Sequence, residues 1–249
     1  MHLCKVFLVF VLWAIIAAPA HAQTGEEVVD RALEALGGEA ALEATRSVTV
    51  EALASISAAS MSMEASLKYI NVRPDKLRME ISVASFGMEI VQGTDGKDFW
   101  LSTNGTVTDV PSEQIPQFRQ NAESILPGLS FKNLRNAGVE FEYVGRETLQ
   151  GIDVHHIRYP TPADLAPSSQ GGEVDWYFSV GTGLPLASMM ESTSGPATAW
   201  FEDYREVGLV MMPFRWEFEA GGQAGMTVTV QNVQTNKPVE PGLFERPQG

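Results

Sequence analysis

The sequence predicts a mainly β protein, built around one wide antiparallel sheet and a few helices. Apolar and polar residues alternate through four successive segments between Ser47 and Leu101. The same alternation returns at residues 174–178, 214–218 and 226–230. Strict period-two alternation is typical of strands with one apolar face and one solvated face. Counting such runs gives about ten strands, whose ends are uncertain by a few residues.

Turn sequences rich in glycine separate the alternating runs, as β-hairpins require. They are Asp95-Gly96, Asn104-Gly105, Gln150-Gly151, Gly181-Thr182-Gly183 and Ala220-Gly221-Gly222. The longest irregular connection runs from Pro160 to Gly172 and is rich in Pro, Ser and Gly, so we expect a surface loop there.

Three helical segments are expected. Residues 24–27 have the T-x-x-E form of a capping box, and Gly37-Gly38 ends the helix that follows. Residues 39–44 form a second short helix, and a third begins near Ser112 and ends before Pro127. The apolar stripe of the first helix is Val29, Leu33 and Leu36, and that of the third is Ile115, Phe118, Ala122 and Ile125.

A comparison of widths predicts how the sheet and the helices fit together. Ten strands spaced about 4.8 Å apart make a sheet roughly 48 Å wide. Three helices about 10 Å across cover roughly 30 Å. The sheet should therefore curl around the helices and leave a concave side that they fill incompletely. The alternative is that the apolar face packs solidly and its methionines are only filler.

Residue parity within each strand predicts which side chains face the concave side. The predicted cavity residues are Val50, Ala52, Met63, Ala65, Leu67, Met79, Ile81, Met88 and Ile90. Methionine suits a ligand-binding surface because its flexible thioether adapts to irregular gaps. The stripe on the first helix should dock on the sheet and compete with a ligand for the same apolar surface.

The N-terminus has the form of a secretory signal peptide. Lys5 precedes an apolar run, and Ala20-His21-Ala22 is a cleavage site, so residues 1–22 should be removed and 23–249 should form a single domain. A retained anchor is the alternative. Cys4, the one cysteine, lies in the removed part and cannot carry a lipid. The remaining 227 residues have a net charge of −15, because Lys5 is lost from a chain of net charge −14.

This composition excludes several classes of function. The acidic balance and the lack of a Lys/Arg cluster argue against binding to nucleic acid. The chain contains neither H-E-x-x-H nor G-x-S-x-G. His155 and His156 are adjacent, so in a strand they point to opposite faces and cannot grip one metal ion. Asp95 and Asp98 are better explained by a hairpin turn than by a calcium loop. We therefore expect no enzyme, no metal and no cofactor.

An ordered set of motifs resembles the LolA-like group of periplasmic outer-membrane lipoprotein-sorting proteins, over nearly the whole chain after residue 22. The motifs are Ala-Leu-Gly-Gly at 35–38, Arg-Ser-Val at 46–48, V-R-P-D-K-L-R-M-E at 72–80, Q-G-T-D-G at 92–96, Phe99-Trp100, Gly145, Gly151, Trp176-Tyr177-Phe178, Gly183-Leu184-Pro185, Pro213-Phe214 and Asn236. The resemblance implies an antiparallel half-barrel whose concave apolar face is closed by helices acting as a lid. It also implies that an arginine before a proline, here Arg73, hydrogen-bonds to the lid backbone; the alternative is an ordinary surface arginine.

We therefore expect a periplasmic carrier for acyl chains, not lipid-anchored, that is a monomer and binds acylated lipoproteins or other lipids. The resemblance adds an inner-membrane release complex and an outer-membrane acceptor as partners. The lid would comprise Val29, Leu33, Leu36 and Arg73. The alternative is a non-transporting envelope sensor or scaffold whose interior is filled by its own side chains, and an enzyme acting on lipids ranks last.

Overall fold

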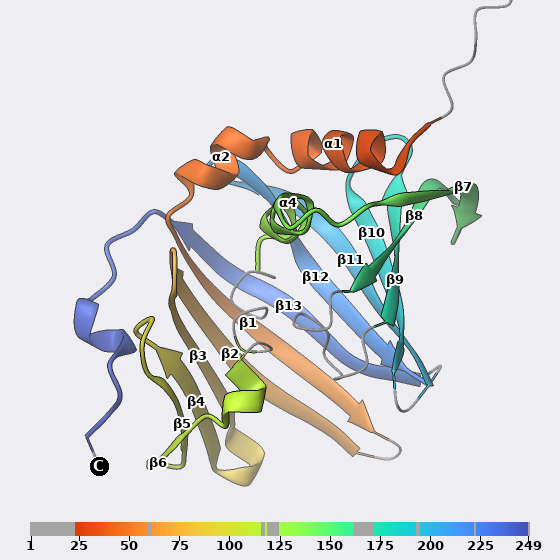
Figure 1. The fold of residues 1–249 in the computed structure, drawn as a ribbon. Coiled ribbons are helices and arrows are strands. Elements are labelled where there is room, and N and C mark those ends of the chain that lie inside the picture. The colour runs from red at the N-terminus through yellow and green to blue at the C-terminus, as the bar shows by residue number, and fades with distance from the viewer. Residues whose placement is uncertain are drawn as a thin grey trace, which may run out of the picture.

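A computed structural model describes residues 23–58, 61–115, 118, 125–161, 172–192, 195–221 and 223–248. One antiparallel sheet of 13 strands runs through them, in the order β6-β5-β4-β3-β2-β1-β13-β12-β11-β10-β9-β8-β7. The sheet curls around the helices (Figure 1), and β6 and β7 are its two edges. It is the predicted antiparallel half-barrel.

The strands follow one another along the chain and mostly pair with their sequence neighbours. Their bounds are β1 Ser47–Ala58, β2 Met61–Val72, β3 Lys76–Val83, β4 Met88–Thr94, β5 Phe99–Thr103, β6 Thr106–Asp109, β7 Glu142–Leu149, β8 Ile152–Thr161, β9 Gly172–Ser179, β10 Pro185–Ser192, β11 Gly195–Val207, β12 Val210–Ala220 and β13 Gln223–Thr235. The pairing of β1 with β13 is the one long-range closure, and it places the first and last strands side by side at the centre of the sheet.

The predicted hairpin turns are confirmed where the structure describes them. Asn104 and Gly105 connect β5 to β6 with φ of 49° and 84°, and Gln150 and Gly151 connect β7 to β8 with φ of 49° and 81°. Two successive left-handed residues give the turn a twist that matches the twist of the flanking strands. The count of about ten strands was too low, because the structure has 13 and short strands such as β6 leave little alternation in the sequence. Of the loop expected between Pro160 and Gly172, both end residues belong to strands, and 162–171 lie outside the described residues.

The helices partly match the prediction. Helix α1 (Gly25–Ala35) starts with the predicted capping box between Thr24 and Glu27, and α2 (Glu39–Ala44) follows Gly38. Of the third predicted helix, Ile115 and Phe118 are helical and Ile125 and Leu126 are not, while 116–117 and 119–124 lie outside the described residues. A further helix that was not predicted, α4 (Pro127–Asn136), begins at Pro127. Proline is well tolerated in the first turn of a helix, where its missing N–H costs no hydrogen bond. Three short 3₁₀ turns complete the described part: η1 (Ala84–Phe86), η2 (Ser112–Gln114) and η3 (Pro241–Phe244).

Helices α1 and α2 lie at one end of the half-barrel, across the tips of strands (Figure 1). Helix α1 packs on α4, β7 and β8, and α2 packs on α4. The backbone N–H of Met211 donates to the Leu36 carbonyl over 3.1 Å. Gly37, with a φ of 115°, lies so close to Leu209 that an added Cβ would be 2.5 Å from the Leu209 carbonyl oxygen. This end, which we call the helix end, is therefore closed by backbone contacts.

The C-terminal segment after β13 crosses the outer face of the sheet, beyond β3 to β5 (Figure 1). The indole N–H of Trp100 donates to the Phe244 carbonyl over 3.1 Å, and Arg78 donates to the Leu243 carbonyl over 3.1 Å. Trp100 is fully buried by this arrangement. The segment thus gives the outer face of the β3–β5 region a cover of its own.

Candidate ligand-binding face

Among the described side chains, the inner face of six adjacent strands, β4-β3-β2-β1-β13-β12, carries no charged group. One cross-strand row shows the pattern: Ala52 lies opposite Leu67, Leu67 opposite Ile81, and Ile81 opposite Ile90. The intervening positions, which face the other side, include Glu51, Lys68, Glu80 and Glu89. Because side chains alternate between the faces of a strand, this register separates an apolar inner face from a charged outer face.

The structure brings all nine predicted cavity residues to this inner face. Val50, Ala52 and Ala65 are buried, with 3%, 5% and 2% of their surface exposed. The other six are half-buried, namely Met63, Leu67, Met79, Ile81, Met88 and Ile90. The small residues therefore form the floor of the face, and the methionines and larger aliphatic residues surround it. Contact with a ligand remains a prediction.

An aromatic cluster that the sequence did not reveal fills the other half of the concave side. Phe131 of α4 meets Trp176 edge-on at 4.9 Å between ring centroids, and it lies 5.3 Å from Phe178. Trp176 in turn stacks on Phe201 at 5.3 Å with 10° between the ring planes. The alternation of Trp176 and Phe178 was visible in the sequence. Their partner was not, because helix α4 was not predicted.

Hydroxyl groups in this core remain protonated and neutral. The indole N–H of Trp176 donates to the Tyr159 hydroxyl over 3.3 Å, and burial raises the pKa of Tyr159 to about 12. Burial also raises the pKa of Tyr204. The Tyr204 hydroxyl is the buried side-chain polar atom that has no hydrogen-bond partner within the described part of the chain. The concave side therefore presents no ionised phenol to a ligand.

The predicted lid helix docks away from most of the predicted cavity. Val29, Leu33 and Leu36 are 0%, 3% and 1% exposed, so the stripe is buried as expected. However, α1 packs on α4, β7 and β8, whereas the nine cavity residues belong to β1, β2, β3 and β4. Among the described helical residues, Phe118 comes nearer to the cavity strands, meeting Phe99 of β5 edge-on at 5.6 Å. Ala122, predicted on the same stripe, lies outside the described residues.

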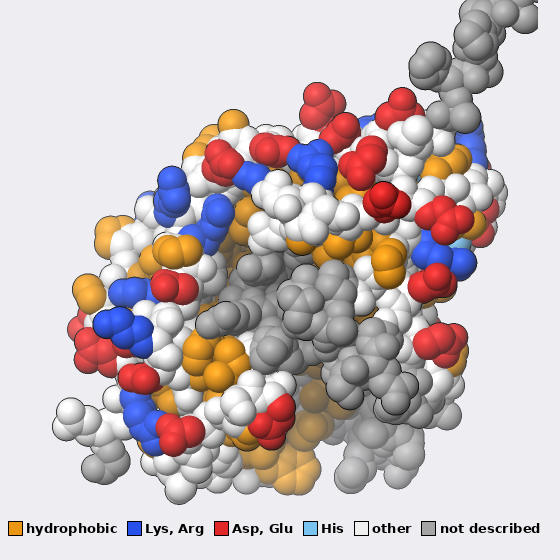
Figure 2. Space-filling view, in the orientation of Figure 1, with side chains coloured by type: hydrophobic (Ala, Val, Ile, Leu, Met, Phe, Trp, Pro, Cys, Tyr) orange, Lys and Arg blue, Asp and Glu red, His pale blue; other side chains and the backbone are white. Residues whose placement is uncertain are grey.

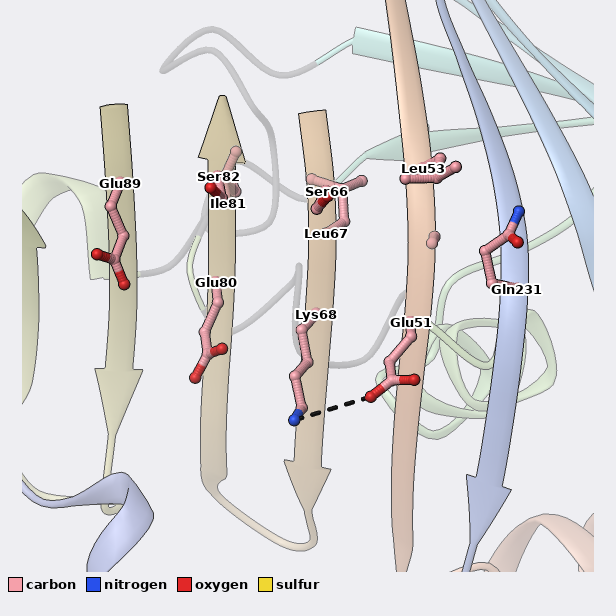
Figure 3. A pocket seen from close by; sticks show the side chains of 11 residues that line it. Glu51, Leu53, Ser66, Leu67, Lys68, Glu80, Ile81, Ser82, Glu89 and Gln231 are labelled. Atoms are coloured by element: carbon pink, nitrogen blue, oxygen red, sulfur yellow. Dashed lines mark ion pairs between the residues drawn. The ribbon is translucent and has the colours of Figure 1, made fainter. Parts of the chain in front are cut away.

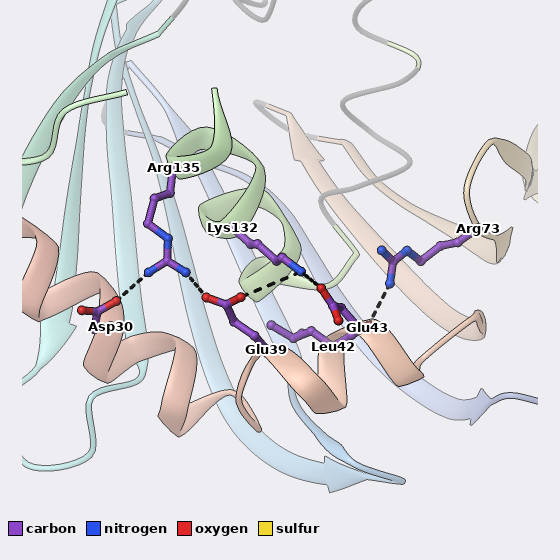
Figure 4. Close-up of polar contacts among 7 residues, drawn as sticks. All are labelled: Asp30, Glu39, Leu42, Glu43, Arg73, Lys132 and Arg135. Carbon is purple, nitrogen blue, oxygen red and sulfur yellow. Dashed lines mark hydrogen bonds and ion pairs between the residues drawn. The ribbon is translucent and has the colours of Figure 1, made fainter. Parts of the chain in front are cut away.

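Arg73 holds the second helix rather than the first. Its Nη1 donates to the Leu42 carbonyl over 2.8 Å and to the Thr45 carbonyl over 3.4 Å. These carbonyls lie at the C-terminal end of α2, where a helix carries a partial negative charge. Arg73 follows β2, so this contact ties the end of α2 to the strands that carry the candidate site (Figure 4). Whether the contact controls opening remains a prediction.

Two cations on α4 connect all three helices (Figure 4). Arg135 bonds to Asp30 of α1 over 2.6 Å and to Glu39 of α2, and Lys132 bonds to Glu43 of α2. The Lys132 hydrogen bond and charge lower the pKa of the Glu43 carboxyl below its ordinary value. Side chains of Lys132 and Arg135 are only 13% and 27% exposed, so this clamp is better shielded than an ordinary surface ion pair.

The two histidines point to opposite faces, as predicted, but both are buried. His155 lies beside Phe178 on the inner side, and its Nδ1 is 3.1 Å from the Tyr143 hydroxyl. Burial, helped by the charge of Arg31, lowers the pKa of His155 below 6.5. His156 lies on the outer side between two carboxylates, 2.7 Å from Glu147 and 2.6 Å from Asp175.

The outer cluster around His156 was missed because its members are scattered in the sequence. Burial alone would raise the pKa of Asp175, but hydrogen bonds from Arg158 and His156 outweigh it and hold the pKa below its ordinary value. The cluster crosses β7, β8 and β9 and stabilises that edge of the sheet. In the described part of the chain, no group of three or more His, Cys, Asp or Glu side chains is arranged to hold a metal ion.

Two depressions in the described surface lie outside the concave side. One crosses the outer face of β1 to β4, where Glu51, Lys68, Glu80 and Glu89 project from neighbouring strands (Figure 3). Glu51 and Lys68 pair with each other across it at 3.8 Å. The other lies beside α1 and is lined mainly by carboxylates. Hydrophobic side chains are also visible on the face of the molecule below the helices (Figure 2).

Comparison with known proteins gives the class to which this fold belongs. No protein-family model matches the sequence, and no curated protein matches it. Solved structures do match its fold. A LolA superfamily protein from Nitrosomonas europaea is 14% identical, with a TM-score of 0.59 over 90% of this chain and 98% of its own. The fold is LolA-like.

Two further structures support this assignment. An outer-membrane lipoprotein-sorting protein domain from Vibrio parahaemolyticus is 12% identical, with a TM-score of 0.60 over 88% of this chain and 97% of its own. A DUF1329 family protein from Desulfovibrio piger is 12% identical, with a TM-score of 0.63 over 90% and 98%. Among the helices that the structure describes, none is long and apolar enough to cross a membrane.

Proposed function

We propose that this protein is a periplasmic binding protein and carrier for acyl chains, which it holds on the concave face of the half-barrel. The observation that carries the proposal is the uncharged inner face that spans β4-β3-β2-β1-β13-β12. A hydrocarbon chain needs no charged partner, whereas most active sites need charged groups, and the polar side chains on this face, such as Asn71 and Gln92, are neutral amides. We infer that the protein acts by binding and not by catalysis.

Hydrocarbon burial can supply the necessary affinity. Each buried methylene contributes about 0.8 kcal/mol, so a dozen contribute roughly 10 kcal/mol before the cost of association is subtracted. The half-buried methionines Met63, Met79 and Met88 can adapt to chains of different length, because thioethers are flexible and polarisable. Acylated lipoproteins are the cargo we favour, since one structure of similar fold is a lipoprotein-sorting domain.

A second candidate function is a sensor or scaffold that binds no lipid. The observation favouring it is the burial of the inner floor, since Ala54 and Ala65 are each only 2% exposed. A carrier must uncover this floor when it accepts a chain, whereas a scaffold keeps it covered. The two candidates therefore differ in what occupies the floor in the cell.

Mass spectrometry of the native protein separates the candidates. The protein is secreted through its own N-terminal segment, purified without detergent and extracted with organic solvent. A carrier should release lipoprotein-derived or lipid acyl species, in lower yield from a Met79→Glu variant that places a charge on the inner face. A matched Glu80→Gln variant changes the neighbouring residue on the outer face and should keep its cargo. Absence of acyl species from the wild type would favour the scaffold.

A further inference from the structure

The end of the half-barrel opposite the helices carries a row of partly exposed apolar side chains. In the register of four adjacent strands, Phe218 lies opposite Met226, Met226 opposite Ile56, and Ile56 opposite Met63. Phe218 is 38% exposed, and the other three are half-buried. We call these four residues the distal row. Phe86, at the nearby tip between β3 and β4, is 66% exposed.

The helix end of the same strands is different. Val48 on β1, and Val210 and Met212 on β12, are at most 1% exposed. Hydrogen bonding between Met211 and Leu36 closes this end. Because the inner face is continuous from one end of these strands to the other, a long apolar chain lying along it reaches solvent more easily past the distal row.

The charge around the distal row has one sign. At this end, the tips of β1 to β4 and of β10 to β13, residues 56–64, 83–90, 188–198 and 217–227, contain five glutamates and no lysine or arginine. On the neighbouring tip of β8 and β9, Arg158 is paired with Asp175. Four of these glutamates, Glu64, Glu89, Glu191 and Glu219, form no ion pair within the described part of the chain; only Glu217 does. Alternation places each of the four beside an inward apolar residue: Met63, Met88, Met190 and Phe218, respectively.

We propose that the bound hydrocarbon chain leaves the concave side at the distal row, and that the unpaired glutamates beside this row select a ligand whose polar end carries no negative charge. The inference rests on the proposed function and deepens it by naming the ligand class. Unpaired carboxylates repel an anionic head group and attract a cationic one. Salt screens such exposed charges over about 8 Å at physiological ionic strength, so the preference should weaken as salt is added.

The head-group preference can be measured with two amphiphiles that share one chain. Dodecyltrimethylammonium and dodecanoate, both below micelle formation, are titrated against the protein carrying the neutral fluorophore N-phenylnaphthylamine. We expect the cation to displace the fluorophore at a concentration roughly fivefold lower at low salt, a difference typical of a few partly screened charges. Replacing Glu64, Glu191 and Glu219 by Gln should bring the two concentrations together.

A matched variant controls for net charge. Glu26→Gln, Glu34→Gln and Glu206→Gln change the charge equally, but these residues lie at the helix end. This variant should keep the preference for the cation. The inference would be overturned if both amphiphiles displaced the fluorophore equally from the wild type, or if the two triple variants had equal effects. Either result would still be consistent with the proposed binding of acyl chains. Failure of both amphiphiles to displace the fluorophore would instead contradict the proposed function.

The position of the exit is tested with a bulky maleimide on a single introduced cysteine, in a Cys4→Ser background. Phe218→Cys lies in the distal row, and Leu53→Cys is its control, because Leu53 is 49% exposed on the outer face of the same sheet. Modification at Phe218→Cys should slow fluorophore uptake at least severalfold, and modification at Leu53→Cys should not. Equal uptake rates after both modifications would show that the chain enters elsewhere.

Discussion

The two ends of the half-barrel are built from the same strands but are stabilised differently. At the helix end, α1, α2 and α4 are joined by ion pairs, a backbone hydrogen bond ties the end of α1 to β12, and the Arg73 side chain ties the end of α2 to β2. At the opposite end, the distal row is apolar and partly exposed, and the described tips of β1 to β4 and β10 to β13 carry no cation. The difference teaches that one end provides the stability of the fold, while the other is free to change its contacts.

The largest expected effect on stability comes from the aromatic cluster under α4. Phe131 is 1% exposed between Trp176 and Phe178, so Phe131→Ala should lower the free energy of unfolding by about 3–5 kcal/mol. Phe86→Ala, at the exposed tip, should change it by less than about 0.5 kcal/mol. Urea denaturation followed by circular dichroism measures both. Similar losses of unfolding free energy in the two variants would show that the two ends contribute equally to stability.

The lid model predicts a gain in apparent acyl affinity when the helix end is weakened. Leu33→Ala should destabilise closure by about 2 kcal/mol, the low end for a buried leucine. If the closed state dominates, apparent affinity rises up to about thirtyfold while the melting temperature falls. Arg73→Leu should act in the same direction, because Arg73 holds the carbonyls at the end of α2.

Titration with a fluorescent acyl probe decides between the lid and a fixed cap. Unchanged or weaker binding in both variants would remove the lid model. Leu33→Ala is the more stringent of the two variants, since α1 packs on β7 and β8 rather than on the strands of the nine cavity residues.

The ion pairs that Arg135 and Lys132 form with α1 and α2 should contribute less to stability than Phe131 or Leu33. Arg135→Gln removes the bonds to Asp30 and Glu39, and we expect a loss of about 1 kcal/mol at low salt that shrinks as salt is added. Arg146→Gln is the control, because the pair of Arg146 with Asp153 is more than half exposed. Thermal melts at low and high salt measure both variants. A loss for Arg135→Gln that does not depend on salt would mean that packing, not charge, holds the helices together.

The smallest effect concerns pH. Burial lowers the pKa of His155 below 6.5, so the unfolded chain binds more protons than the folded one when the pH falls below that value. The contribution of His155 to stability is therefore complete above pH 6.5 and is lost as the pH falls through its folded pKa. His155→Gln should reduce the fall in melting temperature between neutral pH and about pH 5. An unchanged pH dependence would assign the effect to other groups.

Alternation in the sequence was enough to predict the sheet and its inner face. Val50, Ala52 and Met63 were placed correctly because the side chains of a strand alternate between only two faces. The apolar residues take the face that is buried. The position of α1 could not be predicted, because its stripe of Val29 and Leu33 fits any apolar surface. Helix α4 was missed because Pro127 and Gly128 at its start look like a terminator. Gly128 is small because Leu42 packs closely over it, a contact that only the tertiary structure reveals.

The central claim, that an acyl chain lies on the concave face, is best tested by fluorescence quenching with a brominated lysophosphatidylcholine. Trp216 and Trp200 lie on neighbouring strands but on opposite faces: Trp216 packs in the main core, and Trp200 packs against the separate outer cluster around Tyr177. Variants are made that keep only one of these tryptophans, with the others replaced by Phe. A chain bound on the concave face should quench Trp216 strongly and Trp200 only a little. Equal quenching of both, or quenching of Trp200 alone, would contradict binding on this face.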